Sequence, residues 1–470
     1  MKIKNICCIG AGYVGGPTMA VIALKCPEIK INVVDTNLKK IRYWNKKDLN
    51  KLPVFEPGLS KIIGKTRNKN LFFSTKVGKA IDEADMIFMA VNTPTKTSGK
   101  GKGMAADLTF VEKCAMQIAK FSSSDKIVVE KSTLPVRTAE KIKKVLSSEN
   151  KKVKFEVISN PEFLAEGTAI NDLFKSDRVL IGGDDTKSGQ EAVEKLVEIY
   201  ERWIPKNKIL RTNVWSSELS KLVSNAMLAQ RISSINSISA LCEKTEANIQ
   251  EVSKAVGMDS RIGPDFLKSS IGFGGSCFKK DILNLVYISR QYGLSEVADY
   301  WENVIKINSY QTFRFGDKII NKIKSNKEDQ IVTILGWAFK KNTNDSRESA
   351  SIYLTNQLLD QKIKIKIYDP MVQKERILED LKLQLESSGK SNKEIKELVS
   401  QITICKDAYV ALKNVNFAAI CTEWDEFKSY DWNKIYNNMK DNPWVFDGRN
   451  LLDKHKLQSI GFKTFFLGQV

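Results

Sequence analysis

A cysteine and an aspartate follow a glycine-rich loop in the stretch "GFGGSCFKKD", residues 272–281. The three glycines expose backbone N–H groups and allow a ligand to come close. Cys277 is expected at or near the start of a helix, where the helix dipole and the following Lys279 and Lys280 would lower the pKa of its thiol. Asp281, four residues on, would share the same helix face. Most cysteines are small buried residues, but the glycine loop and a cofactor-binding domain favour a reactive thiol here.

Two further pairs of polar residues could take part in chemistry. Glu162 and Glu166 lie in "NPEFLAEG", and Lys221 and Asn225, four residues apart, lie in "SSELSKLVSNAM". Taken singly, each glutamate is explained as an acid favoured at a helix N-terminus, and the lysine as a solvated surface residue. Together with the cysteine they supply an acid, a base, an amine and an amide. Because His455 is the only histidine, acid–base chemistry must depend mainly on Asp, Glu, Lys or Cys.

The N-terminal stretch "KNICCIGAGYVGG" predicts a strand followed by a dinucleotide-binding turn. Gly10 would allow the tight turn, Gly12 the approach of a pyrophosphate, and Gly15 the close packing of helix and strand. A second strand, "INVV", ends at Asp35, which would accept the ribose hydroxyls and repel a 2′-phosphate. NAD is therefore expected in preference to NADP. The uncharged run 6–24 is long enough to span a bilayer, but this pattern favours a nucleotide fold.

Further alternating segments predict the class of fold. Strands are expected within 84–95, 125–136, 154–167 and 177–183, with ligand-binding loops at their carboxyl ends. A run without Gly or Pro, 206–256, has helical spacing of its apolar residues and predicts a long helix from near Ser216.

A second strand–helix–strand unit follows the polar stretch "KSNKEDQ" and ends at Asp369, without the glycines of the first unit. Its first turn is not built for NAD, and a substrate that carries its own nucleotide would suit it. The fold class predicted is α/β, with two Rossmann-like doubly wound domains joined by a long central helix. The expected domains are 1–212 for NAD, 213–325 for the central helices and the cysteine loop, and 326–470 for a nucleotide sugar.

Composition limits the other classes of function. The 470 residues have a formal net charge of +19, but the lysines are scattered, and no nucleic-acid-binding motif is evident. A solvated basic surface is therefore favoured over nucleic-acid binding. The eight cysteines include no CxxC pair, which argues against a zinc site or a disulfide framework and favours a reducing, cytoplasmic location. No metal, membrane or nucleic-acid partner is expected.

Several of these segments resemble one family over nearly the whole chain. The motifs "GAGYVGGPT", "VNTPTKT", "EKSTLPVRTAE", "SNPEFLAEGTAI", "SSELSKL", "GFGGSCF", "FKKNTNDSRES" and "FDGRN" are similar to those of UDP-glucose 6-dehydrogenases, in the longer form found in animals and plants. These enzymes belong to the UDP-glucose/GDP-mannose dehydrogenase family. The resemblance implies oxidation of UDP-glucose to UDP-glucuronate with two NAD and one water. It also implies that Cys277 forms a thiohemiacetal and then a thioester.

The resemblance assigns roles to the other polar residues. Lys221 would stabilise the developing oxyanion with help from Asn225. Glu162 resembles the base that activates the hydrolytic water, which Thr133 would help to order. Asp281 resembles an acid that works through an ordered water. Which group takes the first proton is left open.

The resemblance also implies which residues bind the cofactor and the substrate. The positions expected at NAD are Gly10, Ala11, Gly12, Tyr13, Val14, Gly15, Asp35, Lys40, Val91, Asn92, Thr93, Pro94, Thr95, Thr133, Glu166, Cys277, Lys280 and Arg347. The positions expected at the UDP-sugar are Glu162, Phe163, Leu164, Ala165, Glu166, Lys221, Asn225, Arg261, Lys268, Ser269, Ser270, Ile271, Gly272, Phe273, Gly274, Phe339, Lys340 and Arg449. Lys40 stands where animal relatives commonly have arginine.

The resemblance has a consequence for assembly and leaves alternatives open. Arg261 resembles an arginine that reaches a neighbouring subunit's sugar site, so a homodimer at least is expected, and animal members of the family form hexamers. A sister dehydrogenase for GDP-mannose or a UDP-aminosugar shares the fold and the cysteine loop; the chain length and the segment "KTSGKGKGMAAD" favour UDP-glucose. A single-oxidation hydroxyacid dehydrogenase would not need the cysteine. A catalytically silent nucleotide-sugar binder would not need the four catalytic candidates.

Overall fold

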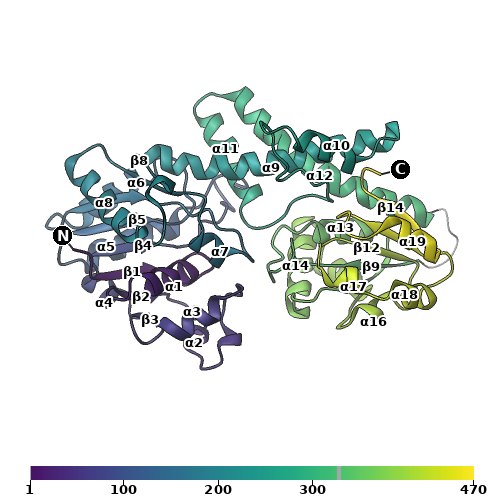
Figure 1. Cartoon of the computed structure of the whole chain (residues 1–470), viewed down its shortest axis with the longest axis horizontal. Helices are drawn as coiled ribbons and strands as arrows, with labels where there is room; N and C mark the ends of the chain where they lie inside the picture. Colours follow the sequence, from purple (N-terminus) through teal and green to yellow (C-terminus); the bar gives the residue numbers. More distant parts are fainter. Residues whose placement is uncertain (1, 325–329, 470) are drawn as a thin grey trace. The chain divides into compact units, whose positions relative to one another are not determined.

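The computed structural model describes residues 2–324 and 330–469. The chain forms two compact units (Figure 1). The first comprises Met1–Ser224 and Leu283–Gly293, and the second Asn225–Ile282 and Leu294–Val470. The predicted boundary at 325/326, in the stretch "KSNKEDQ", lies outside the described residues, and the division into three domains stays a prediction.

The first unit is built on an eight-stranded sheet of order β3-β2-β1-β4-β5-β6-β7-β8. Its first six strands have the order of a dinucleotide-binding fold. The strands are β1 (Asn5–Ile9), β2 (Lys30–Val34), β3 (Leu71–Ser74), β4 (Met86–Met89), β5 (Lys126–Glu130), β6 (Phe155–Ser159), β7 (Val179–Gly183) and β8 (Ile209–Asn213). The helices are α1 (Gly15–Lys25), α2 (Leu38–Trp44), α3 (Leu59–Thr66), α4 (Val77–Glu83), α5 (Thr109–Phe121), α6 (Thr138–Glu149), α7 (Ala169–Phe174) and α8 (Lys187–Tyr200), with 3₁₀ turns at Leu49–Lys51 and Lys206–Lys208.

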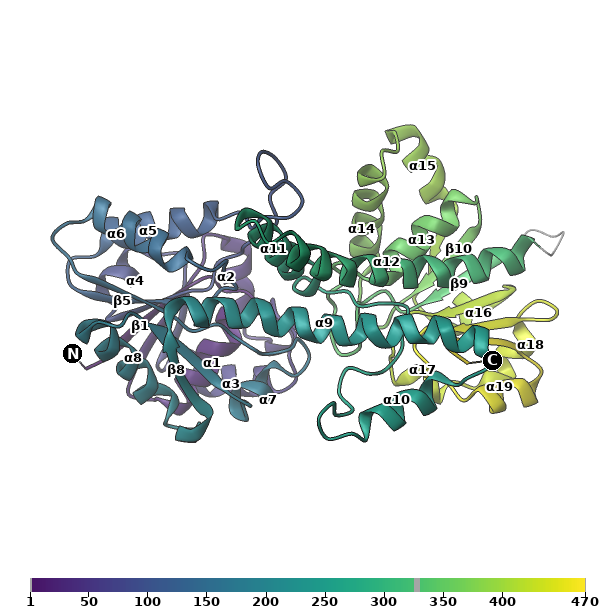
Figure 2. The ribbon, with the colours of Figure 1, turned by 90° about the horizontal axis from the view of Figure 1, so that it is seen from above.

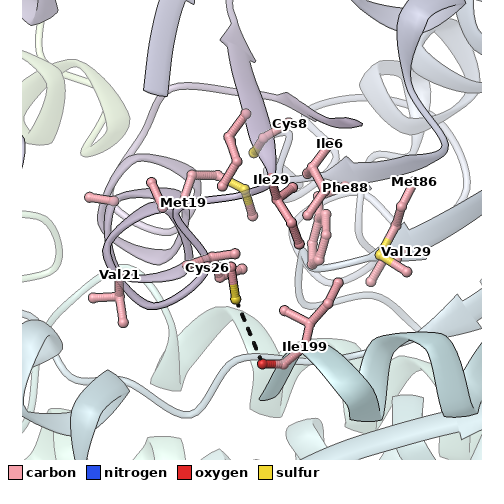
Figure 3. Packing of buried hydrophobic residues seen from close by; sticks show 14 of the residues in the cluster. Ile6, Cys8, Met19, Val21, Cys26, Ile29, Met86, Phe88, Val129 and Ile199 are labelled. Carbon is pink, nitrogen blue, oxygen red and sulfur yellow. Dashed lines mark hydrogen bonds between the residues drawn. The ribbon is translucent and has the colours of Figure 1, made fainter. Parts of the chain in front are cut away.

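Helices cover both faces of this sheet, because successive side chains of a strand point to opposite sides. In β1, Ile6 and Cys8 belong to a core with Met19 of α1, whereas Cys7 and Ile9 belong to a core with α4, α5 and α6. Figure 3 shows the first of these cores. The uncharged run 6–24 is thus a buried strand and a buried helix. Within the described residues, the structure has no helix that combines the length and hydropathy needed to cross a membrane.

The first sheet has one antiparallel pair of neighbouring strands. β7 pairs antiparallel with β6, through Ser159 and Gly182, whereas the other neighbouring strands of the sheet are parallel. A parallel neighbour needs a crossover connection. Between β6 and β7 the chain has only α7, six residues long, and it turns back instead.

The predicted long helix is present as α9 (Val214–Thr245), 32 residues long (Figure 2). Its first residues belong to the first unit and the rest, from Asn225, to the second. Helix α11 (Phe278–Gln291) also divides between the units, after Ile282.

The second unit contains a six-stranded parallel sheet of order β11-β10-β9-β12-β13-β14. This is again the strand order of a dinucleotide-binding fold, as expected. The strands are β9 (Ile331–Leu335), β10 (Lys364–Tyr368), β11 (Ile402–Ile404), β12 (Phe417–Ile420), β13 (Trp444–Asp447) and β14 (Lys463–Phe466). The helices are α10 (Ile249–Gly257), α12 (Ser295–Lys324), α13 (Ala350–Asp360), α14 (Lys374–Ser387), α15 (Asn392–Ser400), α16 (Ala408–Leu412), α17 (Glu426–Ser429), α18 (Trp432–Asn438) and α19 (Lys454–Ile460).

Candidate active site

The turn after β1 has the geometry of a dinucleotide-binding turn. Gly10 has φ +112°, and an added Cβ there would lie 2.1 Å from the Ala90 oxygen. At Gly15 an added Cβ would lie 2.0 Å from the Gly10 oxygen. At Gly12 it would meet nothing within 4 Å, so the backbone there is open to a ligand. Packing requires glycine at Gly10 and Gly15, whereas Gly12 leaves space for a pyrophosphate.

Asp35, directly after β2, provides the acid expected at the ribose. Its carboxylate accepts hydrogen bonds from the Ala11 backbone N–H (3.1 Å), the Asn37 backbone N–H (2.9 Å) and Lys40 Nζ (2.8 Å). Burial opposes its ionisation, but the hydrogen bonds from Lys40 and the two N–H groups outweigh burial and lower the pKa of Asp35. An ionised carboxylate beside the glycine turn fits NAD, and Tyr13 and Val14 complete that turn.

The loops after β4 and β5 are joined to each other. The Thr93 hydroxyl donates to the Thr133 backbone oxygen (3.1 Å), and the Ser132 hydroxyl donates to the Val91 oxygen (2.6 Å). Thr95 forms a β-bridge with Ala106. The predicted NAD segment, Val91, Asn92, Thr93, Pro94 and Thr95, therefore has its position fixed against the loop that carries Thr133.

Glu162 and Lys221 form a buried ion pair in the first unit. Their side chains are 8% and 5% exposed, and Lys221 Nζ lies 3.5 Å from Glu162 Oε1. The other carboxylate oxygen accepts the Leu164 N–H at 2.7 Å. Lys221 Nζ also lies 5.3 Å from the centre of the Phe163 ring. The proposed base and the proposed oxyanion-stabilising amine are thus in contact. Of their predicted neighbours in this segment, Ala165 is exposed and Glu166 half-buried.

Cys277 immediately precedes α11, as expected, and its backbone oxygen accepts the Asp281 N–H at 2.8 Å in the first turn. The thiol is half-buried, with Ser276 Oγ 3.5 Å from its sulfur. The Asp281 carboxylate is buried and accepts a 2.7 Å hydrogen bond from Asn225 Nδ2. The second unit therefore joins the amide and the acid that the sequence singled out separately.

The two lysines after the cysteine have partners of their own. Lys279 Nζ lies 2.8 Å from Glu348 Oε2 and donates to the Tyr353 hydroxyl at 3.0 Å. Burial opposes its charge, but Glu348 and Tyr353 together raise the pKa of Lys279. Lys280 Nζ lies 3.7 Å from Asp281 Oδ1. The charge of Lys279 is thus balanced by Glu348, and a lowered pKa of the Cys277 thiol stays a prediction.

The segment that leads to the cysteine is held from several sides within the second unit. Asn236 of α9 accepts the Ser270 N–H (2.8 Å), and the Ile271 N–H donates to the Gly448 oxygen (2.8 Å). Asn308 of α12 accepts the Phe273 N–H (2.8 Å). Among its other predicted members, Ser269 accepts a hydrogen bond from Asn450, Lys268 is exposed, and Gly272 has φ +126°.

The glycines before the cysteine make room for Phe339. An added Cβ at Gly274 would lie 2.4 Å from the Glu348 oxygen and 2.9 Å from Phe339 Cβ. Arg449 donates to the Phe339 oxygen (3.2 Å), and Lys340 Nζ lies 5.6 Å from the centre of the Phe339 ring. The residues expected at the UDP-sugar in the second unit are therefore brought together, with Arg261 and Lys268 as exposed exceptions.

Two predicted arginines make local ion pairs. Arg347 pairs with Asp345 (2.5 Å), and its backbone oxygen accepts the Gly275 N–H (2.8 Å). Arg261 pairs with Asp259 (2.6 Å) on an exposed loop.

Several residues that hold the site were not predicted from the sequence. The roles of Asn236 and Asn308 could not be predicted, because their hydrogen-bond partners lie 34 and 35 residues away and no local sequence pattern indicates these contacts. Lys131 and Asn160, which hydrogen-bond to each other (3.1 Å), lie inside the quoted motifs "EKSTLP" and "SNPEF". These motifs could have drawn attention to both residues, but lysines are usually exposed, so a buried position was not expected for Lys131.

The fold and these residues define the class of protein as a dinucleotide-dependent dehydrogenase with a second nucleotide-binding unit. Residues 4–204, 215–310 and 333–454 match the NAD-binding, central and UDP-binding domains of the UDP-glucose/GDP-mannose dehydrogenase family. The chain belongs to this family. NAD is its cofactor, as predicted, and the recognised resemblance is confirmed.

Individual UDP-glucose dehydrogenases that are similar to this chain support its assignment to the family. UDP-glucose 6-dehydrogenase 3 of Arabidopsis thaliana is 54% identical over 468 residues, which cover 99% of this chain and 97% of the relative. UDP-glucose 6-dehydrogenase of Drosophila melanogaster is 55% identical over 466 residues, with coverage of 99% and 96%. The structure of a UDP-glucose dehydrogenase from Pyrobaculum islandicum superposes with a TM-score of 0.82 at 27% identity, covering 100% of this chain and 98% of that one.

Proposed function

We propose that this chain oxidises UDP-glucose to UDP-glucuronate, with two NAD and one water consumed per sugar. The observation that carries the proposal is that the chain is 54% identical, along 99% of its length, to a UDP-glucose 6-dehydrogenase. The candidate groups for a four-electron oxidation are present: a thiol at a helix start, two buried carboxylates, an amine and an amide.

The thiol provides the covalent step. NAD, held at the glycine turn and Asp35, would accept a hydride from C6 of the sugar in each of the two oxidations. In the first oxidation the C6 hydroxyl also loses its proton, which gives an aldehyde. Between the two oxidations, the Cys277 sulfur adds to the aldehyde carbon, and the carbonyl oxygen becomes the hydroxyl of a thiohemiacetal. Loss of the second hydride and the hydroxyl proton gives a thioester. Water then attacks the carbonyl carbon, the carbon–sulfur bond breaks, and the thiolate and the carboxylate product are released.

The neighbouring polar groups serve the individual steps. Lys221, nearly buried, places a positive charge where an oxyanion develops, and Asn225 adds a hydrogen-bond donor. Glu162 takes a proton from the hydrolytic water, which Thr133 helps to order. Asp281, held by Asn225 (2.7 Å), acts as an acid through an ordered water. The remaining cofactor and UDP-sugar positions predicted from the sequence are proposed as contacts of these two ligands.

Assembly and location are further parts of the proposal. Arg261, whose side chain is 87% exposed, is proposed to reach the sugar site of a neighbouring subunit, so the active form is at least a homodimer. The hexamer known for animal members of the family remains a further expectation. A cytoplasmic location is proposed because the eight cysteines are all free thiols.

The stoichiometry of NADH formation tests the proposal. With limiting UDP-glucose and excess NAD, we expect about two NADH per sugar. GDP-mannose and a UDP-aminosugar, assayed in parallel, should give little NADH. One NADH per sugar would indicate a single oxidation, and a faster reaction with either control would assign the chain to a sister activity.

A further inference from the structure

Arg178, directly before β7 in the first unit, joins the loop after β6 to helix α9. Its guanidinium carbon lies 3.8 Å from the centre of the Phe163 ring, and its Nη2 donates to the Ser224 hydroxyl at 3.1 Å. Phe163 belongs to the loop that contains Glu162. Ser224 lies about one helical turn after Lys221 in α9. The arginine therefore contacts both segments that supply the buried ion pair.

The Glu162 carboxylate closes a short turn around Phe163. Its Oε2 accepts the Leu164 N–H at 2.7 Å, whereas its Oε1 lies 3.5 Å from Lys221 Nζ. Phe163 is thus the middle residue of a three-residue turn that the carboxylate itself completes. A displacement of Phe163 would move the Leu164 N–H and, with it, the carboxylate. Whatever holds the Phe163 ring therefore also fixes the proposed base.

Hydrophobic packing does not hold this ring. Leu164 packs against the core of the first unit, but Phe163 is half-buried and, among the described residues, does not belong to that core or to its packed neighbours. Two cations face the ring instead, Arg178 at 3.8 Å and Lys221 Nζ at 5.3 Å. The negative face of an aromatic ring attracts a cation, and the planar guanidinium can also stack on it.

Other groups hold the far end of the loop. The buried Glu56 accepts the N–H groups of Gly167 (2.9 Å) and Ala169 (3.1 Å). These hydrogen bonds lie beyond the turn that Glu162 closes. They fix the approach to α7 and leave the ring at the centre of that turn to Arg178.

An ordinary surface ion pair does not explain Arg178. Within residues 2–324 and 330–469, no carboxylate forms an ion pair with its guanidinium. Its contacts are a ring and a hydroxyl, which are both uncharged, and each belongs to a segment that carries a proposed catalytic group. The position of this side chain is therefore tied to the candidate active site.

We propose that Arg178 is a positioning residue: by holding the Phe163 ring against α9, it keeps the Glu162 carboxylate beside Lys221 while the thioester is hydrolysed. The inference rests on the proposed function, in which Glu162 serves the hydrolytic step. Arg178 acts through Glu162 and takes no proton itself. Its loss should therefore slow hydrolysis more than either oxidation.

The substitution Arg178→Met tests this role through the kinetics of NADH formation. Steady-state kcat should fall by up to about 100-fold, because a small displacement of a catalytic group can have that effect. The KM for NAD should stay close to that of the unmodified enzyme. A burst of about two NADH per active site should precede the slow turnover, since both oxidations come before the thioester. Slow turnover without this burst would overturn the proposal.

The double variant with Glu162→Gln separates positioning from general damage. Once the base is gone, Arg178 has no catalytic carboxylate left to position. Arg178→Met should therefore leave the residual turnover of Glu162→Gln nearly unchanged, whereas two independent effects would multiply. A further loss of about 10-fold in the double variant, as expected for independent effects, would overturn the proposal.

Arg67→Met is the matched control. Arg67 is likewise half-buried, lies in the first unit, and donates to the backbone oxygens of Trp44 (2.7 Å) and Lys46 (2.8 Å). Its loss removes an arginine that holds a different part of the same unit. At saturating NAD and UDP-glucose, kcat should stay close to that of the unmodified enzyme, with no burst, whatever the change in thermal stability. An equal fall in both variants would assign the effect to destabilisation and overturn the role of Arg178.

Two milder variants decide the question if Arg178→Met does not fold. Arg178→Lys keeps the charge but loses the planar group that stacks on Phe163, so it should also show the burst and the slow turnover. Ser224→Ala removes only the hydroxyl acceptor and should lower kcat by up to about 10-fold. Full activity in either variant would overturn the proposal, because each removes one of the two contacts on which it depends.

The unmodified enzyme and Glu162→Gln distinguish failure of this inference from failure of the proposed function. If the unmodified enzyme forms no UDP-glucuronate, the proposed function fails. If it forms this product and Glu162→Gln shows the burst, the Arg178 and Ser224 variants alone decide the positioning role.

Discussion

The two Rossmann-like sheets of this chain begin alike and differ at their first turn. In the first unit, the Gly10 N–H donates to the Val34 oxygen at 2.8 Å; in the second, the Gly336 N–H donates to the Tyr368 oxygen at 2.8 Å. Both glycines have positive φ, +112° and +96°. The chain therefore uses the same turn to leave the first strand of each sheet.

The acid that follows the second strand has a different task in each unit. Asp35 accepts two backbone N–H groups and the Lys40 side chain, and it stands beside the open position at Gly12. Asp369 is 8% exposed. Its carboxylate accepts hydrogen bonds from the backbone of Trp337, Ala338, Met371 and Val372 and from the indole N–H of Trp424.

The turn after β9 in the second unit also contains a large buried side chain. Trp337, which follows Gly336 as Ala11 follows Gly10, is fully buried and donates its indole N–H to Asp380 at 3.0 Å. The same scaffold thus leaves the acid beside an open position of the glycine turn in one unit and uses the acid to close its own loop in the other. This difference agrees with the match of residues 333–454 to the UDP-binding domain of the family.

Replacing Asp369 should have the largest effect and should act on stability. Asp369→Ala leaves five N–H donors without their acceptor, and we expect a loss of roughly 3–5 kcal/mol in the free energy of unfolding of the second unit. Hydrogen exchange should lose protection in β9 and β10 and keep it in β1 and β2. Undisturbed exchange in β9 would contradict a structural role for this carboxylate.

Replacing Asp35 should act on the cofactor instead. Asp35→Ala should weaken NAD binding by roughly 1–3 kcal/mol, the range for losing hydrogen bonds to a charged group. It should also narrow the preference for NAD over NADP, because the carboxylate no longer repels a 2′-phosphate. Calorimetry with both cofactors checks this. An unchanged preference would remove Asp35 from the ribose site.

The smallest effect is expected from Lys40→Gln. The ion pair of Lys40 with Asp35 is 2.8 Å long, but the lysine side chain is one-third exposed, and such pairs contribute about 0–1 kcal/mol. NAD affinity should change less than about 5-fold by the same estimate. NADP should bind less well, because the variant lacks the Lys40 ammonium near the 2′-phosphate. A loss of NAD affinity as large as that of Asp35→Ala would mean that Lys40 itself holds the cofactor.

Local patterns predicted the parts of this fold that depend on neighbours in the sequence. The strand, the glycine turn, the helix and Asp35 follow each other within 35 residues, and Ile6, Cys7, Cys8 and Ile9 form a continuous apolar run without a charge. The start of α11 directly after Cys277 was predicted for the same reason.

Contacts between distant segments were not predicted. Lys279 pairs with Glu348, 69 residues away, whereas the sequence placed its charge near the thiol. The antiparallel pairing of β7 depends on the path of the connection between β6 and β7, and no residue type in that connection indicates the strand direction. Lys131 is buried because Asn160 and Tyr200 supply its partners from 29 and 69 residues away.

Covalent retention of the sugar is proposed for the Cys277 thiol, and hydrolysis for the Glu162 carboxylate. Glu162→Gln keeps the size of the side chain and removes the base. This variant should form about two NADH per active site in one burst, because a thioester forms only after both oxidations. Turnover should then slow by roughly 10²–10⁴-fold, as expected for lost general-base catalysis.

The most direct measurement is mass spectrometry of Glu162→Gln after that burst. We expect a UDP-sugar acyl group on the peptide that contains Cys277, and no such group in the double variant with Cys277→Ala. A stalled Glu162→Gln enzyme with no burst and no adduct on Cys277 would contradict the thioester role of the cysteine or the assignment of Glu162 to its hydrolysis.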